Sequence, residues 1–354
     1  MKKLLIVSIY SIVHSIVDMA CAMLMAGAVI PHITSVLDMA VALILYNMFA
    51  FAFQFPFGLF ADKLNKNALV SAVGCGCVVV AYAVSPFKFM ACVVAGIGNA
   101  LFHVGGGIDV LNISDGKASL PGIYVATGAL GLYIGSSSHS LGFANYYVMC
   151  GILLFAMVSL VWLYRKVKYT YCIENEKADI REMYGIREKI NSKQIIMYCL
   201  LITICLRSYM GSILNFQWKS GFEKGLICVV AVGLGKMLGG IVGDRFGWRR
   251  VSTISLAISA LLFVFAFDNM ICGIMALMLF NMTMPITLTA LANIFYHNRG
   301  AAFGMTTLAL FIGAVPVIMG YPAWGFNEAG VCVMTLISTV VLFVGLMIYE
   351  RVRL

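Results

Sequence analysis

The chain has 354 residues, of which 62% are hydrophobic and only 11% are charged, and its mean hydropathy is +0.97. A soluble protein of this length could not cover so large an apolar core with so few charged residues. The net charge of +9 comes without a basic stripe interleaved with aromatic residues, so we expect no nucleic-acid partner. The composition predicts an all-α membrane protein with the lipid bilayer around it.

Twelve apolar segments are long enough to cross a bilayer about 30 Å thick. We expect these transmembrane helices at about 4–29, 38–61, 67–87, 88–110, 119–141, 143–164, 194–218, 224–243, 249–268, 269–293, 300–320 and 329–349. The polar segment 165–193 is predicted to be a cytoplasmic linker, or else a regulatory or lipid-contacting strap. It would separate an N-terminal six-helix bundle, residues 1–164, from a C-terminal six-helix bundle, residues 194–354.

The N-terminal apolar run imitates a signal peptide, but His14 and Asp18 interrupt it, so we expect a retained first span. The eleven cysteines lie almost wholly in apolar segments, without the paired spacing of a zinc site or a disulfide framework. We therefore expect no resident metal ion and no cofactor.

Lysine and arginine gather in alternate loops. One set of loops holds Lys63, Lys66, Lys117, Arg245, Arg249, Arg250 and Arg299, whereas the opposite set holds little beyond Lys88, Lys219 and Lys224. By the positive-inside rule, this asymmetry predicts that both termini lie in the cytoplasm. The expected location is the plasma membrane or a bacterial inner membrane.

A charged hairpin between two apolar helices occurs once in each half, at 58–67 and at 239–250. In each copy a glycine precedes an aspartate by four residues, and basic residues follow. The glycine would let a neighbouring helix approach closely, and the aspartate would face the N-terminus of such a helix. The basic residues would pair with the aspartate, and Asn65 would tolerate a left-handed turn. The residues expected to act here are Gly58, Asp62, Lys63, Gly240, Asp244, Arg245, Gly247 and Arg249.

These paired loops make the chain resemble the major facilitator superfamily, whose loop pattern is G-x-x-x-D-R-x-G-R-[RK]. The second copy departs from the pattern at Trp248, which stands at a basic position. The first copy departs at Lys63, Asn65 and Asn67, which replace arginine, glycine and the last base. The resemblance implies two pseudo-symmetric six-helix halves and transport by alternating access. It also implies that the loops control conformational switching and do not choose the substrate.

Three short motifs resemble a narrower branch, the fosmidomycin-resistance type, whose members are drug exporters or uncharacterised transporters. They are G-I-G-N-A-L-F-H at 96–103, His14-x-x-x-Asp18 and Arg207-Ser208. Val104 stands where a proline usually follows.

A glycine series in the fifth span, at 128, 131 and 135, resembles the antiporter motif, with Ser136 in place of its proline. This series predicts close helix packing and favours export by antiport.

Ionisable residues within apolar spans cost about 2.5–3.5 kcal/mol each on insertion scales, so those present are candidate functional groups. His14 and Asp18 share one helical face near the middle of the first span. We predict that Asp18 loads and releases a proton, with His14 tuning or relaying it. A central cavity between the halves would bind substrate through Arg207, Lys236, His103, Asn99 and Gln54.

Two other interpretations of these charges stay open. Asp18 could pair permanently with a cation of the other half and act as a structural bolt. Alternatively, His14, Asp18 and Cys21, at i, i+4 and i+7, could join His103 in passing a divalent transition-metal ion. The cations of the second half would repel such an ion.

The function predicted from these residues is secondary active transport, with proton-coupled export of a small organic compound or drug that carries an anionic group. An enzyme is not expected, because H-E-x-x-H, G-x-S-x-G and Walker-type motifs do not occur. A divalent transition-metal transporter is one alternative, and a non-transporting membrane sensor or scaffold is an alternative of another class. The expected partners are a small-molecule substrate and protons, and the expected state is a monomer.

Overall fold

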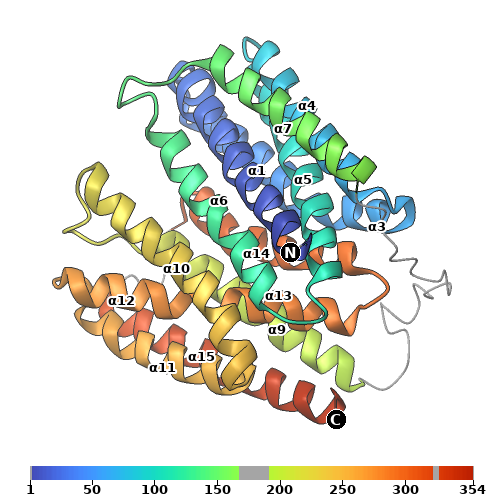
Figure 1. Cartoon of the computed structure of the whole chain (residues 1–354). Coiled ribbons are helices and arrows are strands. Elements are labelled where there is room, and N and C mark those ends of the chain that lie inside the picture. The colour runs from blue at the N-terminus through green and yellow to red at the C-terminus, as the bar shows by residue number, and fades with distance from the viewer. Residues whose placement is uncertain (1, 167–190, 322–326, 354) are drawn as a thin grey trace.

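The computed structural model describes residues 2–166, 191–321 and 327–353, which are helical apart from short turns (Figure 1). The α-helices are α1 (Lys2–Leu24), α2 (Val36–Asn47), α3 (Gln54–Leu64), α4 (Asn67–Ala83), α5 (Lys88–Ile113), α6 (Ser119–Ser137), α7 (Tyr146–Lys166), α9 (Ser192–Ile213), α10 (Phe222–Phe246), α11 (Trp248–Ala266), α12 (Met270–Asn281), α13 (Thr283–Ile294), α14 (Arg299–Ile318) and α15 (Glu328–Arg353). The described residues include no β-strand.

Ten helical segments in the described part of the chain are long and apolar enough to cross a membrane. The two remaining predicted spans are α4, which has 17 residues, and α6, whose glycines and serines lower its hydropathy. Twelve helical spans in an all-α chain are therefore confirmed.

Three of these spans are not continuous α-helices. The first continues from α1 through a π-helical segment, Met25–Val29, and the second passes through another, Met48–Ala52, between α2 and α3. Such π segments are rare and often lie at functional sites. The tenth divides at Met282, three residues before Pro285, which lies in the first turn of α13 and has no backbone N–H. The seventh span ends at Ile213, five residues short of the prediction, because Leu214 adopts an extended conformation.

The two halves meet along two pairs of helices. Helix α6 packs against α10, and α14 packs against α3, while the other extensive contacts stay within α1–α7 or within α9–α15. Figure 1 shows α6 and α10 running side by side. Most of the predicted linker 165–193 lies outside the described residues, so the division into domains at 164 and 194 stays a prediction.

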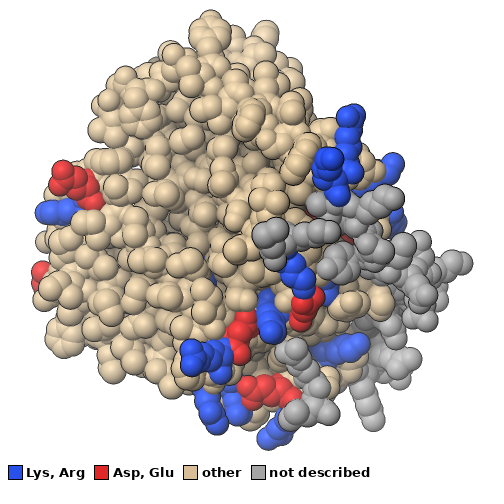
Figure 2. Space-filling model, viewed as in Figure 1, with Lys and Arg blue, Asp and Glu red and all other residues tan. Residues whose placement is uncertain are grey.

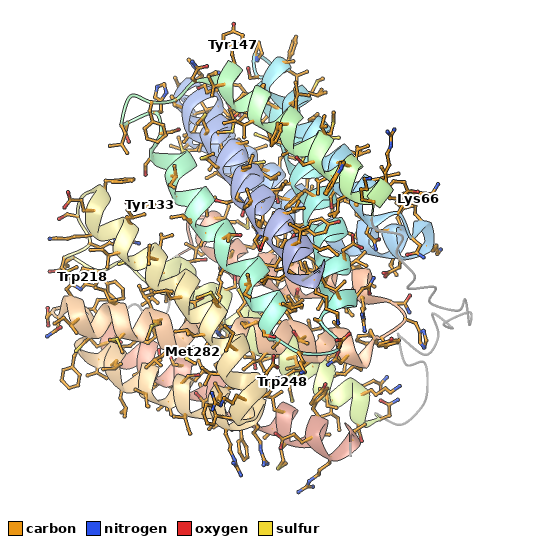
Figure 3. The ribbon with its side chains drawn as sticks, viewed as in Figure 1. Lys66, Tyr133, Tyr147, Trp218, Trp248 and Met282 are labelled. Atoms are coloured by element: carbon orange, nitrogen blue, oxygen red, sulfur yellow. The ribbon has the colours of Figure 1, made fainter. Side chains whose placement is uncertain are left out.

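The surface is that of a multi-pass membrane protein. Large apolar side chains such as Val36, Tyr147 and Ile271 are exposed on it, as contact with lipid requires. On the face in Figure 2, most charged side chains gather at the lower and right margins, with a small group at the left edge. Lys66 lies at the right margin of the view and Tyr147 at the top (Figure 3).

Both ends of the chain lie at the end of the molecule that carries the charged hairpins. Lys3, near the N-terminus, pairs with Asp115 in the loop between α5 and α6, and Glu350, near the C-terminus, pairs with Arg249 of the second hairpin. We call this the hairpin end.

Candidate functional site

The hairpin end is closed by a contact between the halves. The Asp62 carboxylate, at the end of α3, accepts hydrogen bonds from the backbone N–H groups of Gly300 (2.8 Å) and Ala301 (2.9 Å). These N–H groups belong to the first turn of α14, where no intrahelical acceptor exists for them. A carboxylate in this place satisfies them and also interacts favourably with the positive end of the helix dipole.

The second hairpin makes the reciprocal contact. Asp244 of α10 accepts hydrogen bonds from the N–H groups of Ala118 (2.9 Å) and Ser119 (2.8 Å), at the start of α6. The residue numbers of the two contacts differ by 182 throughout: 62 and 244, 118 and 300, 119 and 301. We call this pair of contacts the clasp. It is one interaction repeated by the internal symmetry of the chain.

The motif glycines lie where the helices of the clasp approach most closely. A Cβ atom on Gly58 would lie 2.1 Å from the carbonyl oxygen of Gly300, and one on Gly240 would lie 2.3 Å from that of Ala118. Neither position can hold a side chain while the clasp is closed. Asn65 ends α3 in the left-handed conformation at φ 49°, which confirms the prediction made for it.

The predicted pairing of the basic hairpin residues with the aspartates is wrong. Among the described residues, Lys63 is exposed and makes no ion pair, Arg245 lies over the ring of Phe246, and Arg249 pairs with Glu350 at 3.0 Å. The aspartates instead bind backbone N–H groups, which offer better-placed donors. Trp248, at the position where the family pattern has a base, donates from Nε1 to Asp244 Oδ1 at 2.9 Å.

A contact that the sequence did not predict reinforces the clasp. Arg299 is buried, and its guanidinium donates to the carbonyl oxygen of Leu111 and to Asn112 Oδ1, both at 2.9 Å, where α5 ends. A cation here complements the free carbonyls of the helix C-terminus. The sequence identified Arg299 only as a cytoplasmic charge, although it directly precedes the N–H groups that Asp62 binds.

Removing one aspartate should open its own half of the clasp. In Asp62→Ala, we expect hydrogen exchange at the start of α14 to accelerate, and in Asp244→Ala the same effect at the start of α6. A lost helix cap costs about 0.5–2 kcal/mol, which corresponds to about 2- to 30-fold faster local exchange. The exchange is measured by mass spectrometry, with Asp268→Ala, which changes an exposed aspartate, as control. Equal rates in all three variants would show that the clasp contributes no stability.

A cavity of about 520 Å³ lies between the halves. Six of the seven predicted intramembrane residues line it: His14, Asp18, Gln54, His103, Arg207 and Lys236. Its apolar lining includes Phe51, Phe280 and Phe303. At the end away from the hairpins it reaches exposed Lys219, in the loop between α9 and α10.

On the wall of the first half, His14, Asp18 and His103 form a compact group, here called the His–Asp–His cluster. His14 Nε2 lies 3.2 Å from Asp18 Oδ2, His103 Nε2 lies 3.5 Å from Asp18 Oδ1, and the two Nε2 atoms are 2.8 Å apart. Asn99 donates from Nδ2 to Asp18 Oδ1 at 2.9 Å and does not line the cavity. The structure thus places His103 and Asn99 with Asp18, whereas the prediction assigned both to substrate.

Backbone carbonyls determine which nitrogen of each imidazole carries a hydrogen. His14 Nδ1 lies 2.8 Å from the carbonyl oxygen of Tyr124, and His103 Nδ1 lies 2.8 Å from that of Asn99. Because a carbonyl only accepts, each Nδ1 is the donor, and each neutral ring presents the lone pair of Nε2 to the cluster. Two lone pairs and a carboxylate then face one another. One positive ion shared among them, such as a proton, removes this repulsion.

Cys21, part of the predicted metal set, does not join the cluster. Its Sγ atom lies 3.9 Å from both the carbonyl oxygen of Ala95 and Asn99 Nδ2, on the side of α5. Among the described residues, the potential metal ligands that lie close enough together to hold one ion are His14, Asp18 and His103. The predicted pattern was wrong for Cys21 because this residue lies about one helical turn beyond Asp18 and its thiol contacts α5.

The glycine series of α6 packs directly on α1, as predicted. A Cβ atom on Gly128 would lie 2.3 Å from His14 Nε2 and 2.5 Å from Asp18 Oδ2, and one on Gly131 would lie 2.0 Å from the carbonyl oxygen of Ser15. Gly128 therefore leaves the room that the His–Asp–His cluster occupies.

A methyl group added at Gly128 should lower the stability of the protein measurably, because it would clash with the cluster. We expect Gly128→Ala to destabilise the protein by about 1–3 kcal/mol and lower its midpoint of thermal denaturation in detergent. Gly151→Ala is the matched control, because a Cβ atom there meets nothing within 4 Å. The packing argument would fail if both variants melted at the same temperature as the wild type.

Two cations lie on the wall of the second half. Within the described part of the chain, neither Arg207 nor Lys236 has a salt-bridge partner within 4.0 Å, so the structural bolt to Asp18 is not formed. The buried guanidinium of Arg207 lies 4.7 Å from the ring centroid of Phe280, and its Nε has no hydrogen-bond partner among those residues. Gln54 is also buried, and its Oε1 is likewise without a described partner.

Known proteins resemble this chain in structure. No family model and no curated protein sequence gives a match. The chain is similar to the crystal structure of a variant of the E. coli fucose:proton symporter FucP, with a TM-score of 0.68, 10% identity, and coverage of 99% of each chain. It is also similar to a structure of the major facilitator superfamily transporter FucP in the outward conformation, with a TM-score of 0.64 and 12% identity over 96% of this chain and 99% of that chain. The chain thus has the major facilitator fold.

Proposed function

We propose that this chain is a secondary active transporter that moves a small organic anion across the membrane and couples this movement to protons. One observation carries the proposal. A cavity between the halves is closed at one end by the clasp. One wall carries two cations that have no acidic partner among the described residues, and the other carries the His–Asp–His cluster. These are the parts that coupled transport requires.

Alternating access would work through the clasp. In the present state the aspartate caps hold the hairpin end shut, and the cavity extends towards Lys219 at the other end. If the hairpins lie in the cytoplasm, as the distribution of basic residues favours, this state faces outward. Breaking both caps would let the halves rock and open the cavity to the cytoplasm.

The substrate class follows from the charges of the cavity. Buried Arg207 offers donors that can bind a carboxylate or phosphonate in a two-point contact, and Lys236 adds a second positive charge. Gln54 also lines the cavity, and its Oε1 has no hydrogen-bond partner among the described residues. The phenylalanine rings of the lining would contact an apolar body.

Export in exchange for protons is the direction typical of the branch that the three short motifs resemble. A second candidate is proton symport, which the arrangement of charges favours. When the His–Asp–His cluster has lost its proton, its net negative charge repels an anion in the same cavity, so proton and anion bind best together.

The test uses the purified protein in liposomes with an imposed pH gradient and a panel of organic anions, each paired with a neutral analogue. We expect at least one anion to be concentrated against its gradient and its neutral analogue not to be. Accumulation on the acidic side indicates antiport, whereas accumulation on the opposite side indicates symport. Saturable binding of an anion without flux would instead show a sensor.

A further inference from the structure

The atoms of the His–Asp–His cluster have the spacing of ligands around one metal ion. Ligand atoms about 2.0–2.2 Å from a zinc-like ion, at tetrahedral or octahedral angles, lie about 3.0–3.5 Å from one another. The nitrogen–oxygen separations in the cluster are 3.2 and 3.5 Å, and the two Nε2 atoms are 2.8 Å apart. The side chains would need to move by only a few tenths of an ångström to share an ion.

Each of the three potential ligands also makes a hydrogen bond to a residue outside the cluster, which fixes its orientation. The carbonyls of Tyr124 and Asn99 fix the Nδ1–H form of the two imidazoles and aim Nε2 into the cluster. The Asn99 side chain holds the carboxylate of Asp18. Histidines that bind metals show this arrangement almost always, with the second ring nitrogen donating to a carbonyl or carboxylate.

The donor set and its exposure indicate which ion would bind. Two neutral imidazoles and one carboxylate suit zinc, cobalt or nickel, and three protein ligands leave a coordination position open. All three side chains line the cavity, so this position faces it. Arg207 and Lys236 on the opposite wall disfavour a bare cation but favour one that carries an anionic ligand.

We propose that His14, Asp18 and His103 bind one divalent transition-metal ion of the Zn²⁺ or Co²⁺ type, with the open coordination position towards the cavity. The proposal concerns the same cluster that the proposed function assigns to the proton, and it rests on that function only for the expected competition between metal ion and proton. Metal ion and proton would therefore compete for the same lone pairs.

The test is a titration of the purified full-length chain, prepared with an affinity tag that contains no histidine. We expect Co²⁺ to bind at one ion per chain and to give the visible absorption of a four- or five-coordinate site, and Zn²⁺ to displace it. His103→Asn and Asp18→Asn should each weaken binding by at least about 10- to 100-fold, the loss seen when even outer-shell partners of a metal ligand are removed. His297→Asn and Cys21→Ser, which change residues outside the cluster, should bind as the wild type does.

X-ray absorption at the zinc edge needs no variant, so it serves even if a variant fails to fold. We expect nitrogen or oxygen neighbours at about 2.0–2.1 Å with the scattering pattern of two imidazoles. Sulfur at about 2.3 Å would assign the metal to cysteines and overturn the proposal. So would binding that His103→Asn leaves unchanged, or no saturable binding at all.

The outcomes separate this proposal from the proposed function. A protein that transports an anion with protons but binds no metal ion retains the proposed function and loses the metal site. A protein that binds one metal ion through the cluster but shows no proton-coupled flux retains the metal site and loses the proposed function.

Discussion

Asp18→Asn is expected to abolish accumulation of substrate against its gradient while leaving downhill exchange intact. Asparagine has the shape of the carboxyl group but cannot take up or release a proton. It can also donate from its amide to His14 Nε2, 3.2 Å from Asp18 Oδ2 in the wild type, and so imitate the protonated site permanently. The cluster would then stay in one charge state throughout the cycle, and the pH gradient could do no work.

This expectation is measured in liposomes as the ratio of internal to external substrate with and without a pH gradient. Asp268→Asn, an exposed aspartate outside the cavity, is the matched control and should behave as the wild type does. An Asp18→Asn protein that accumulates substrate with an unchanged pH response would remove Asp18 from the coupling site.

Arg207→Gln and Lys236→Gln are expected to produce the largest losses of substrate affinity. A hydrogen bond to a charged group contributes about 1.5–3 kcal/mol, so each substitution should weaken binding of the anion by about 10- to 150-fold. Arg207 should show the larger effect, because its guanidinium is buried against Phe280 and its Nε has no hydrogen-bond partner in the described part of the chain. Arg207→Lys keeps the charge but not the planar fork, so it should recover only part of the loss.

Affinity is measured by titration of the purified variants, with Lys219→Gln at the exposed mouth of the cavity as control. Lys219 is hydrated and should contribute less than about 1 kcal/mol, or a change of about fivefold. Equal affinity for an anion and its neutral analogue in the wild type, or unchanged affinity in both cavity variants, would place the substrate elsewhere.

The architecture could be predicted because two independent signals agree. The apolar length of the segments determines how many times the chain crosses the bilayer, since backbone groups inside lipid must be satisfied by helices. The glycine and aspartate of each hairpin, repeated at the 182-residue offset, identify the internal symmetry. The short left-handed turn at Asn65 also followed from local chemistry alone.

The contacts of individual side chains could not be predicted in the same way. The sequence predicted that Asp62 would face the N-terminus of a neighbouring helix, but it did not identify that helix as α14, which is remote in sequence. Nor did it show that two N–H groups would bind the carboxylate in place of the basic residues. Likewise, helical spacing put Cys21 near His14 and Asp18, but only the packing of α1 on α5 shows that it points elsewhere.

One buried charge was overlooked although the rule for intramembrane charges applied to it. Asp109 in α5 is fully buried and accepts hydrogen bonds from Tyr10 (2.5 Å) and Asn67 (2.8 Å). It lies within the predicted fourth span, close to its end, and a census of all acidic residues in apolar segments would have found it.

The most direct test of the account is whether substrate moves protons. Liposomes that contain the protein and a trapped pH indicator, prepared without a pH gradient, receive the best ligand of the anion panel on one side. The internal pH is expected to change as the anion moves through the wild-type protein. No such change is expected with Asp18→Asn, even though that variant still exchanges the anion. Transport of the anion by the wild type without any proton movement would contradict the assignment of the His–Asp–His cluster to coupling.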